Sequence, residues 1–140
     1  FRKVFDGFDP QRVSRYGRTK VRALLQDATI IRNRQKIEAA IANAQAFLRL
    51  QERHGTFARF VWDLIDGAPI QHAWRSLRQL PATTRESNRM SQALKEQGFR
   101  FVGSTICYAH MQATGMVNDH LVRCFRYSAI RRLGRKVYPA

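Results

Sequence analysis

The segment from Leu94 to Cys124 constrains the fold of this chain more than any other. Two glycines, Gly98 and Gly103, bracket a short step between two stretches whose apolar residues recur with helical spacing. Because glycine permits positive φ and a close approach of the backbone to another group, the step predicts a tight hairpin between two helices. Such a hairpin is either an ordinary turn with a glycine cap or a means of offering backbone N–H groups to a phosphate.

The start of the second helix is the candidate phosphate-binding element. This helix begins at Ser104, and a helix N-terminus carries unpaired N–H groups and the positive end of the helix dipole. A DNA phosphate would fit there, and such a contact fixes register on the duplex without reading sequence. Arg100, at the hairpin tip, is either a further phosphate contact or a solvated arginine. The candidate nucleic-acid-binding residues are therefore Gly98, Phe99, Arg100, Phe101, Gly103, Ser104 and Thr105.

A histidine and a cysteine follow the second helix. His120 and Cys124 are four residues apart, a spacing that places two side chains on one face of a helix, where both could bind one metal ion. A closed structural zinc site takes four ligands, and no other residue lies at zinc-finger spacing from this pair. Cys107 and His110 offer a second pair, but Cys107 falls among apolar residues, where a free cysteine is more often a core residue. From the residues alone, a metal site is the less favoured interpretation.

The charge balance favours a polyanionic partner. The 140 residues include 25 Lys and Arg against 10 Asp and Glu, a formal net charge of +15. Such an excess favours nucleic acid through counterion release, with an anionic membrane surface as the second choice, while the alternative is a generally basic, arginine-rich protein. No apolar run approaches the roughly 20 residues of a membrane span, and two cysteines make no disulfide framework. A cytoplasmic protein with no membrane association is therefore expected.

The apolar spacing predicts an all-α fold, a bundle of packed short helices. Ser87 is expected to cap a helix that leads into the hairpin, and the helix-hairpin-helix unit should lie at about 88–115. Trp62 is expected in the core, and Trp74 is left open between a core residue and a base-stacking residue. One domain is expected over residues 1–127, followed by a basic tail over residues 128–140. The expected helices are 10–16, 19–26, 33–53, 57–66, 87–97 and 104–114, with a last turn carrying His120 and Cys124.

Several motifs resemble one known family, the 3-methyladenine DNA glycosylase I family. The hairpin and second helix carry the closest resemblance, in Gly98–Tyr108, Met111–Ala113 and Gly115–Cys124. Upstream motifs agree with the same family, and the resemblance extends from the start of the chain to about Tyr127. These upstream motifs are Phe8-Asp9-Pro10, Asp27–Ile37, Phe60-Val61-Trp62 and Ser91–Lys95.

The resemblance implies a helix-hairpin-helix DNA glycosylase fold and an enzyme of base-excision repair. Such an enzyme hydrolyses the N-glycosidic bond of 3-methyladenine after flipping the damaged nucleotide out of the duplex. The implied partner is double-stranded DNA containing alkylated adenine, bound by a monomer. Two alternatives stay open: a non-catalytic DNA-binding fragment of the same fold, and a basic helical RNA-binding protein suggested by charge alone. The Gly98–Cys124 run distinguishes the glycosylase fold from the RNA-binding protein, because charge does not require it.

The same resemblance implies a structural zinc ion. His120 and Cys124 match two of its four ligands, and the other two, a Cys and a His, come from the N-terminal segment of the family. That segment also carries the base-recognition glutamate and the aromatic residues that sandwich the base, and it is expected to be missing before Phe1. The chain is thus expected to be an N-terminally truncated family fold with no catalytic residue assigned. Asn118 stands where other helix-hairpin-helix glycosylases have a catalytic Asp, as it does in this family.

Overall fold

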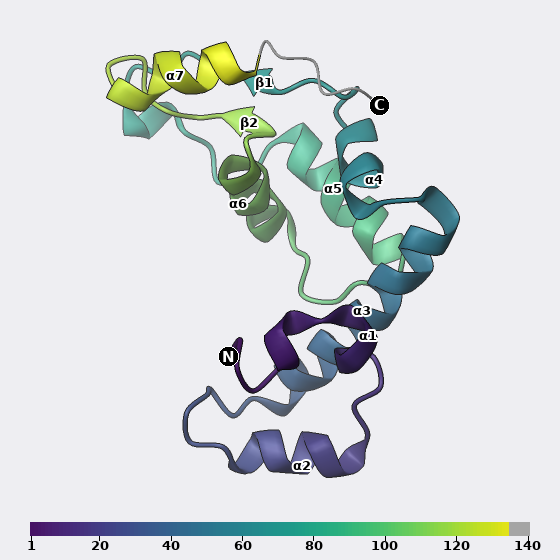
Figure 1. Ribbon diagram of the computed structural model, residues 1–140. Coiled ribbons are helices and arrows are strands. Elements are labelled where there is room, and N and C mark those ends of the chain that lie inside the picture. Colours follow the sequence, from purple (N-terminus) through teal and green to yellow (C-terminus); the bar gives the residue numbers. More distant parts are fainter. Residues whose placement is uncertain (135–140) are drawn as a thin grey trace. The chain divides into compact units, whose positions relative to one another are not determined.

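The computed structural model describes residues 1–134, whose regular secondary structure is almost entirely helical (Figure 1). The all-α fold expected from the apolar spacing is confirmed, with one addition. Two short strands, β1 and β2, pair in parallel, with Ile70 opposite Val117 and Gln71 opposite Asn118. The elements in chain order are η1 (Asp6–Phe8), α1 (Pro10–Val13), α2 (Arg18–Gln26), α3 (Arg34–His54), α4 (Phe57–Asp63), β1 (Ile70–Gln71), η2 (Leu77–Gln79), α5 (Arg85–Glu96), α6 (Ser104–Thr114), β2 (Val117–Asn118) and α7 (Phe125–Leu133).

The described residues cluster into two compact units. The first contains residues 1–57 and 94–101, and the second contains residues 58–93 and the chain from residue 102 onward. The expected boundary between a domain and a tail at residue 127 falls inside α7, which is helical through Leu133. The final part of the expected tail, including Arg135 and Lys136, lies outside the described residues. Among residues 1–134, no helix has both the length and the apolar character that crossing a membrane requires.

The first unit is built around α3. Asn33 caps this helix by accepting a hydrogen bond from the Lys36 amide at 3.1 Å, and Gly55 ends it with φ of 82°. Asp9 caps α1 through the amides of Gln11 and Arg12, as its sequence predicts, although α1 ends at Val13 and is shorter than expected. One core cluster of this unit consists of Phe5, Val13, Leu24, Ile30 and Ile37, with the α3 side chains Ala40, Ile41 and Ala44 packed against it.

The predicted cap of α5 was wrong by three residues. The helix begins at Arg85, so the capping residue is Thr84, and Ser87 lies in the first turn, fully buried. The two residues exchange hydrogen bonds: the Thr84 amide donates to Ser87 Oγ at 2.8 Å, and the Ser87 amide donates to Thr84 Oγ1 at 3.1 Å. Both residues are good N-caps, and the sequence alone did not show which of them ends the preceding extended segment.

The two tryptophans lie at the margins of the second unit. Trp62 is half-buried and faces a pocket, so its expected place in the core was wrong. The helix that carries it, α4, ends at Asp63, before the turn in which Asp66 and Gly67 adopt positive φ, and is shorter than expected. Trp74 is also half-buried, and its indole N–H donates to Asp119 at 2.8 Å. Trp74 is therefore held by a side-chain hydrogen bond.

Candidate nucleic-acid interface

The hairpin between α5 and α6 begins with the glycine turn that the sequence predicts (Figure 1). Gly98 has φ of 89°, its amide donates to Lys95 O at 2.9 Å, and the next amide, of Phe99, donates to Leu94 O at 3.0 Å. These two bonds form a Schellman motif, which satisfies the last carbonyl groups of α5. The second glycine has a different role, because Gly103 is the extended N-cap of α6 with φ of −64°. The other left-handed residue of the hairpin is Phe101, with φ of 57°.

An asparagine on α3 fixes the hairpin tip. The Arg100 amide donates to Asn43 Oδ1 at 2.7 Å, and Asn43 Nδ2 donates to the Arg100 carbonyl at 3.0 Å. This pair of bonds holds the backbone of Arg100 inside the first unit and leaves its side chain exposed. Within residues 1–134, the Arg100 guanidinium forms no ion pair. Asn43 is not among the predicted site residues. In the sequence it is only one polar residue beside the apolar stripe of a long helix.

The start of α6 is anchored from α5 within the second unit. Ser91 Oγ donates to Val102 O at 2.7 Å, and the oxygens Ser87 Oγ and Ser104 Oγ share a hydrogen bond of 2.7 Å. The N-cap Gly103 offers no side-chain acceptor to the first amides of α6. The helix therefore starts with N–H groups that no side chain caps, as a phosphate-binding helix start requires.

The seven predicted hairpin residues divide between backbone and side-chain roles. Phe99 is half-buried and packs its ring against Phe57, with ring centroids 6.1 Å apart. Phe101 and Thr105 are exposed, as is Arg100. The nucleic-acid contacts of Gly98, Phe99, Arg100, Phe101, Gly103, Ser104 and Thr105 stay a prediction.

His120 and Cys124 meet, but not on a helix. The predicted helical turn at this position was wrong, because β2 ends at Asn118 and α7 begins only at Phe125, with Cys124 as its N-cap. The residues between, 119–124, form a loop that brings Cys124 Sγ within 3.6 Å of His120 Nδ1. Two ligands on one tetrahedral zinc ion, at ordinary Zn–S and Zn–N bond lengths, are about 3.6 Å apart. The geometry thus fits half of a zinc site.

No further ligands complete this pair within the described residues. Across residues 1–134, no three His, Cys, Asp or Glu side chains gather in a group that could hold a metal ion. Cys107, the other cysteine, is buried and donates through Sγ to Val102 O at 3.5 Å, which confirms it as a core residue. Burial also lowers the pKa of His110, which favours its neutral form.

Asp119 is the main anchor of the loop that carries His120. Its side chain is only 6% exposed, and Oδ1 lies 2.7 Å from His72 Nδ1 and accepts from Trp74 Nε1 at 2.8 Å. Gln112 Nε2 donates to the second oxygen, Oδ2, at 2.9 Å. Burial alone would raise the pKa of Asp119, but its interactions with Tyr108 and these three residues lower it, so the carboxylate stays ionised. The sequence does not reveal this role, because the partners of Asp119 come from segments that are distant along the chain.

Asn118, beside it, is also committed to the fold. It is 1% exposed, and its Nδ2 donates to Gln71 Oε1 at 3.0 Å and to Tyr127 O at 3.2 Å. Its Oδ1 accepts from the His120 amide at 3.4 Å. The amide is therefore used on both sides by the protein itself, and Asn118 has no group left for a substrate.

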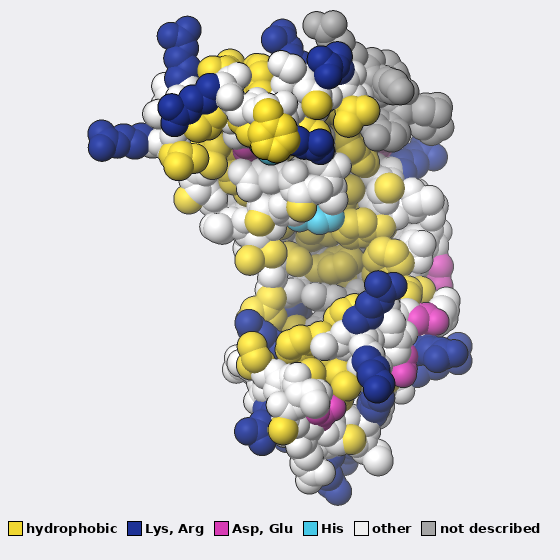
Figure 2. Space-filling view, turned by 60° about the vertical axis from the view of Figure 1, so that its left-hand side comes forward, with side chains coloured by type: hydrophobic (Ala, Val, Ile, Leu, Met, Phe, Trp, Pro, Cys, Tyr) yellow, Lys and Arg dark blue, Asp and Glu magenta, His cyan; other side chains and the backbone are white. Residues whose placement is uncertain are grey.

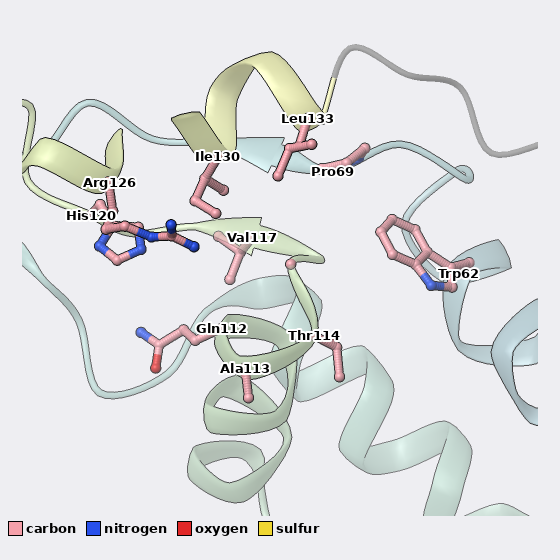
Figure 3. A pocket seen from close by; sticks show the side chains of 12 residues that line it. Trp62, Pro69, Gln112, Ala113, Thr114, Val117, His120, Arg126, Ile130 and Leu133 are labelled. Carbon is pink, nitrogen blue, oxygen red and sulfur yellow. The ribbon is translucent and has the colours of Figure 1, made fainter. Parts of the chain in front are cut away.

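A pocket of about 370 Å³ in the second unit opens beside His120 (Figure 3). Trp62, Val117 and Arg126 line it, together with residues of α6 and α7. The imidazole of His120 is thus accessible from solvent. A metal site that needs further ligands besides His120 and Cys124 requires such access.

Residues 1–127 match the model of one protein family, methyladenine glycosylase. The chain belongs to this family. One relative, DNA-3-methyladenine glycosylase 1 of Escherichia coli (strain K12), is 44% identical over 127 residues, which cover 91% of this chain and 68% of the relative.

Two solved structures of family members share the fold. A crystal structure of 3-methyladenine DNA glycosylase I has a TM-score of 0.84 at 46% identity, covering 89% of this chain and 68% of the other. A point variant of 3-methyladenine DNA glycosylase I, crystallised in complex with 3-methyladenine, has a TM-score of 0.85 at 25% identity, covering 90% and 68% of the two chains. The fold expected from the resemblance is therefore confirmed.

Proposed function

We propose that this protein is a DNA glycosylase of base-excision repair, which hydrolyses the N-glycosidic bond of 3-methyladenine in alkylated DNA. The match over residues 1–127 to a family whose relatives are named for this activity carries the proposal. A relative crystallised with 3-methyladenine supports the choice of base. The strongly basic composition, with net charge +15, suits a DNA-binding enzyme.

The described residues supply DNA binding more clearly than bond cleavage. The N–H groups at the start of α6 can hold one phosphate of the strand. The Arg100 guanidinium, which forms no ion pair within residues 1–134, can hold another. Extrusion of the damaged base would then follow from deformation of the held duplex. Because 3-methyladenine is positively charged when attached to the sugar, it is already a fair leaving group, and binding with exclusion of water can supply much of the catalysis. This agrees with an Asn118 that serves the fold.

The test is release of 3-methyladenine from methylated double-stranded DNA, with the Escherichia coli relative as a positive control. Release above the uncatalysed rate is expected. Binding of the DNA without release would favour the alternative of a non-catalytic DNA-binding protein. Preference for RNA over DNA in competition would favour the basic RNA-binding protein suggested by charge.

A second measurement examines the hairpin. Arg100→Ala should weaken DNA binding about equally on all sequences and lower the slope of log K against log salt by about one, because one phosphate contact is lost. Arg53→Ala, which removes the same charge from an exposed position at the end of α3, is the control. A loss that depends on DNA sequence would contradict a phosphate contact.

We also propose that His120 and Cys124 are two ligands of a structural zinc ion. A zinc ion bound there would cross-link the loop before α7 to whatever residues supply the other ligands, and so stabilise the fold. His120→Ala and Cys124→Ser should each lower the zinc content and the melting temperature, while His54→Ala should not. Unchanged zinc stoichiometry in both variants would show that the two residues are not ligands.

Three further proposals concern the state and setting of the protein. We propose a monomeric state, double-stranded DNA as the partner and a cytoplasmic location, which sedimentation, competition binding and cell fractionation respectively can test.

A further inference from the structure

The turn that leads into α7 presents an aromatic ring to solvent. Phe125 is 89% exposed and Val122, three residues earlier, is 42% exposed. A phenylalanine left in water forgoes the favourable free energy that burying its ring would supply. Isolated exposed apolar residues are ordinary, but a group of them framed by polar side chains is typical of an interaction site.

Arginines frame this ring, and no acidic residue offsets them. Between residues 120 and 134 the sequence contains four arginines and no Asp or Glu. Arg123 and Arg126 lie close to Phe125 in the sequence, are exposed, and form no ion pair with any of the described residues. Arg126 also lines the pocket beside His120. The nearest carboxylate in sequence, Asp119, is buried and occupied by its hydrogen bonds, so it does not neutralise them.

A second segment adds to the same region. The Val122 amide donates to Trp74 O at 2.9 Å, so the chain just after Trp74 runs beside the turn. This segment carries Arg75 and the 74% exposed Leu77. Figure 2 shows hydrophobic side chains interleaved with Lys and Arg side chains around α7, at the top of the view. The aromatic–arginine surface is the set Arg75, Leu77, Val122, Arg123, Phe125 and Arg126.

We propose that the aromatic–arginine surface is a second nucleic-acid contact, in which Phe125 stacks on an unpaired base while Arg123 and Arg126 bind the neighbouring phosphates. The chemistry favours this partner, because stacking on an exposed aromatic ring needs no particular base and guanidinium groups bind phosphate oxygens in pairs. The inference rests on the proposed function for its choice of DNA. It adds a contact from the β2–α7 turn, distinct from the hairpin residues.

The test is binding of a duplex that carries 2-aminopurine opposite an abasic position, followed by affinity and by fluorescence of the probe base. Phe125→Ala and Phe125→Leu should each weaken binding about fivefold or more and lose the fluorescence change, whereas Phe125→Trp should retain both. Leucine keeps an apolar side chain without a π-face and so separates stacking from simple apolar contact. Leu133→Ala, at an exposed position on the same helix, is the control for loss of an exposed apolar side chain. Unchanged binding of Phe125→Ala, or wild-type behaviour of Phe125→Leu, would overturn the stacking role.

The arginines are tested as a pair. Arg123→Gln with Arg126→Gln should lower the salt slope by about two, more than Arg131→Gln with Arg132→Gln, which removes the same charge farther along α7. Equal effects of the two pairs would overturn the placement of phosphates beside Phe125 in favour of a general basic field. Binding of phosphatidylserine vesicles that depends on Phe125, with DNA affinity unaffected, would overturn the inference in favour of a membrane surface.

Failure of this inference is distinguishable from failure of the proposed function. Release of 3-methyladenine with normal DNA binding by the Phe125 variants would leave the glycosylase proposal intact and overturn only the second contact. If no 3-methyladenine were released but Phe125-dependent stacking were still observed, the glycosylase proposal would be overturned and the second contact would stand.

Discussion

The hairpin and the His–Cys loop, defined as residues 97–103 and 119–124, are both short connections at candidate sites, yet different forces hold them. The hairpin is shaped mainly by its backbone: a Schellman turn at Gly98 and a pair of bonds from Asn43 to the main chain of Arg100. The His–Cys loop is shaped by buried side chains, Asn118 and Asp119, which bind groups on β1, α6 and α7. The conformation of the hairpin therefore depends mainly on backbone dihedral preference, whereas that of the His–Cys loop depends on a few buried polar atoms.

This difference sets the expected cost of mutations. Buried polar groups that lose their partners carry the full desolvation penalty, whereas a strained turn costs only the energy of an unfavourable dihedral angle. Substitutions that disturb the His–Cys loop should therefore destabilise the protein more than substitutions in the hairpin. The variants below are ordered from the largest expected effect to the smallest.

Asp119→Ala should have the largest effect. It leaves the half-buried His72 and Trp74 and the exposed Gln112 without the carboxylate acceptor that they share. The expected loss is about 3 kcal/mol of unfolding free energy, since hydrogen bonds to a charged group contribute about 1.5–3 kcal/mol each and water replaces part of what is lost. Urea unfolding measures the change. Because the loop also carries His120, any zinc bound there should be lost more readily.

The control for this variant is Asp63→Ala, which removes an exposed carboxylate from α4 in the same unit. It should change the unfolding free energy by less than about 0.5 kcal/mol, as surface substitutions usually do. If the two variants were equally stable, the carboxylate of Asp119 would not be what holds the His–Cys loop.

The same difference explains what the sequence could predict. Gly98 and the Asp9-Pro10 start of α1 are local signals, in which one residue type fixes the backbone around it, and the structure bears both of them out. The i, i+4 spacing of His120 and Cys124 correctly predicted that the two side chains meet, but for the wrong reason.

What the sequence could not show is pairing over long separations. Helical spacing does not predict that β1 pairs with β2, which lies 47 positions later, and that pairing replaces the expected helical turn with a strand and a loop. Asp119 and Asn43 have their roles only because distant segments bring partners to them. In isolation, each is one polar residue among many.

Asn43→Ala should have an intermediate effect and sharpens the comparison from the side of the hairpin. It removes both hydrogen bonds to the backbone of Arg100, for an expected loss of about 1–2 kcal/mol, and hydrogen exchange of the Arg100 amide should speed up. Asn43→Asp keeps the acceptor for that amide and loses only the donor, so its effect should be smaller.

Gln45→Ala is the matched control on the same helix. Gln45 is an exposed amide two residues along α3, and it donates to Ser14 O, which is outside the hairpin. Its variant should leave exchange at Arg100 unchanged. Faster exchange in both variants would mean that α3 as a whole, and not the Asn43 amide, protects the tip.

Gly98→Ala should have the smallest effect and tests whether backbone preference alone shapes the hairpin. An alanine in the left-handed conformation, here at φ of 89°, costs about 1 kcal/mol. Space is not the obstacle, because a Cβ at Gly98 would lie 3.5 Å from an Arg49 side-chain nitrogen, an ordinary contact. Gly103→Ala is the control: its φ of −64° suits any residue, and no atom lies within 4 Å of the added Cβ. The weaker N-cap preference of alanine should be offset by the lower conformational entropy of the unfolded chain, so little net change in unfolding free energy is expected. A loss at Gly103 equal to that at Gly98, measured by urea unfolding, would mean that contacts rather than dihedral preference shape the hairpin, and the contrast with the His–Cys loop would no longer hold.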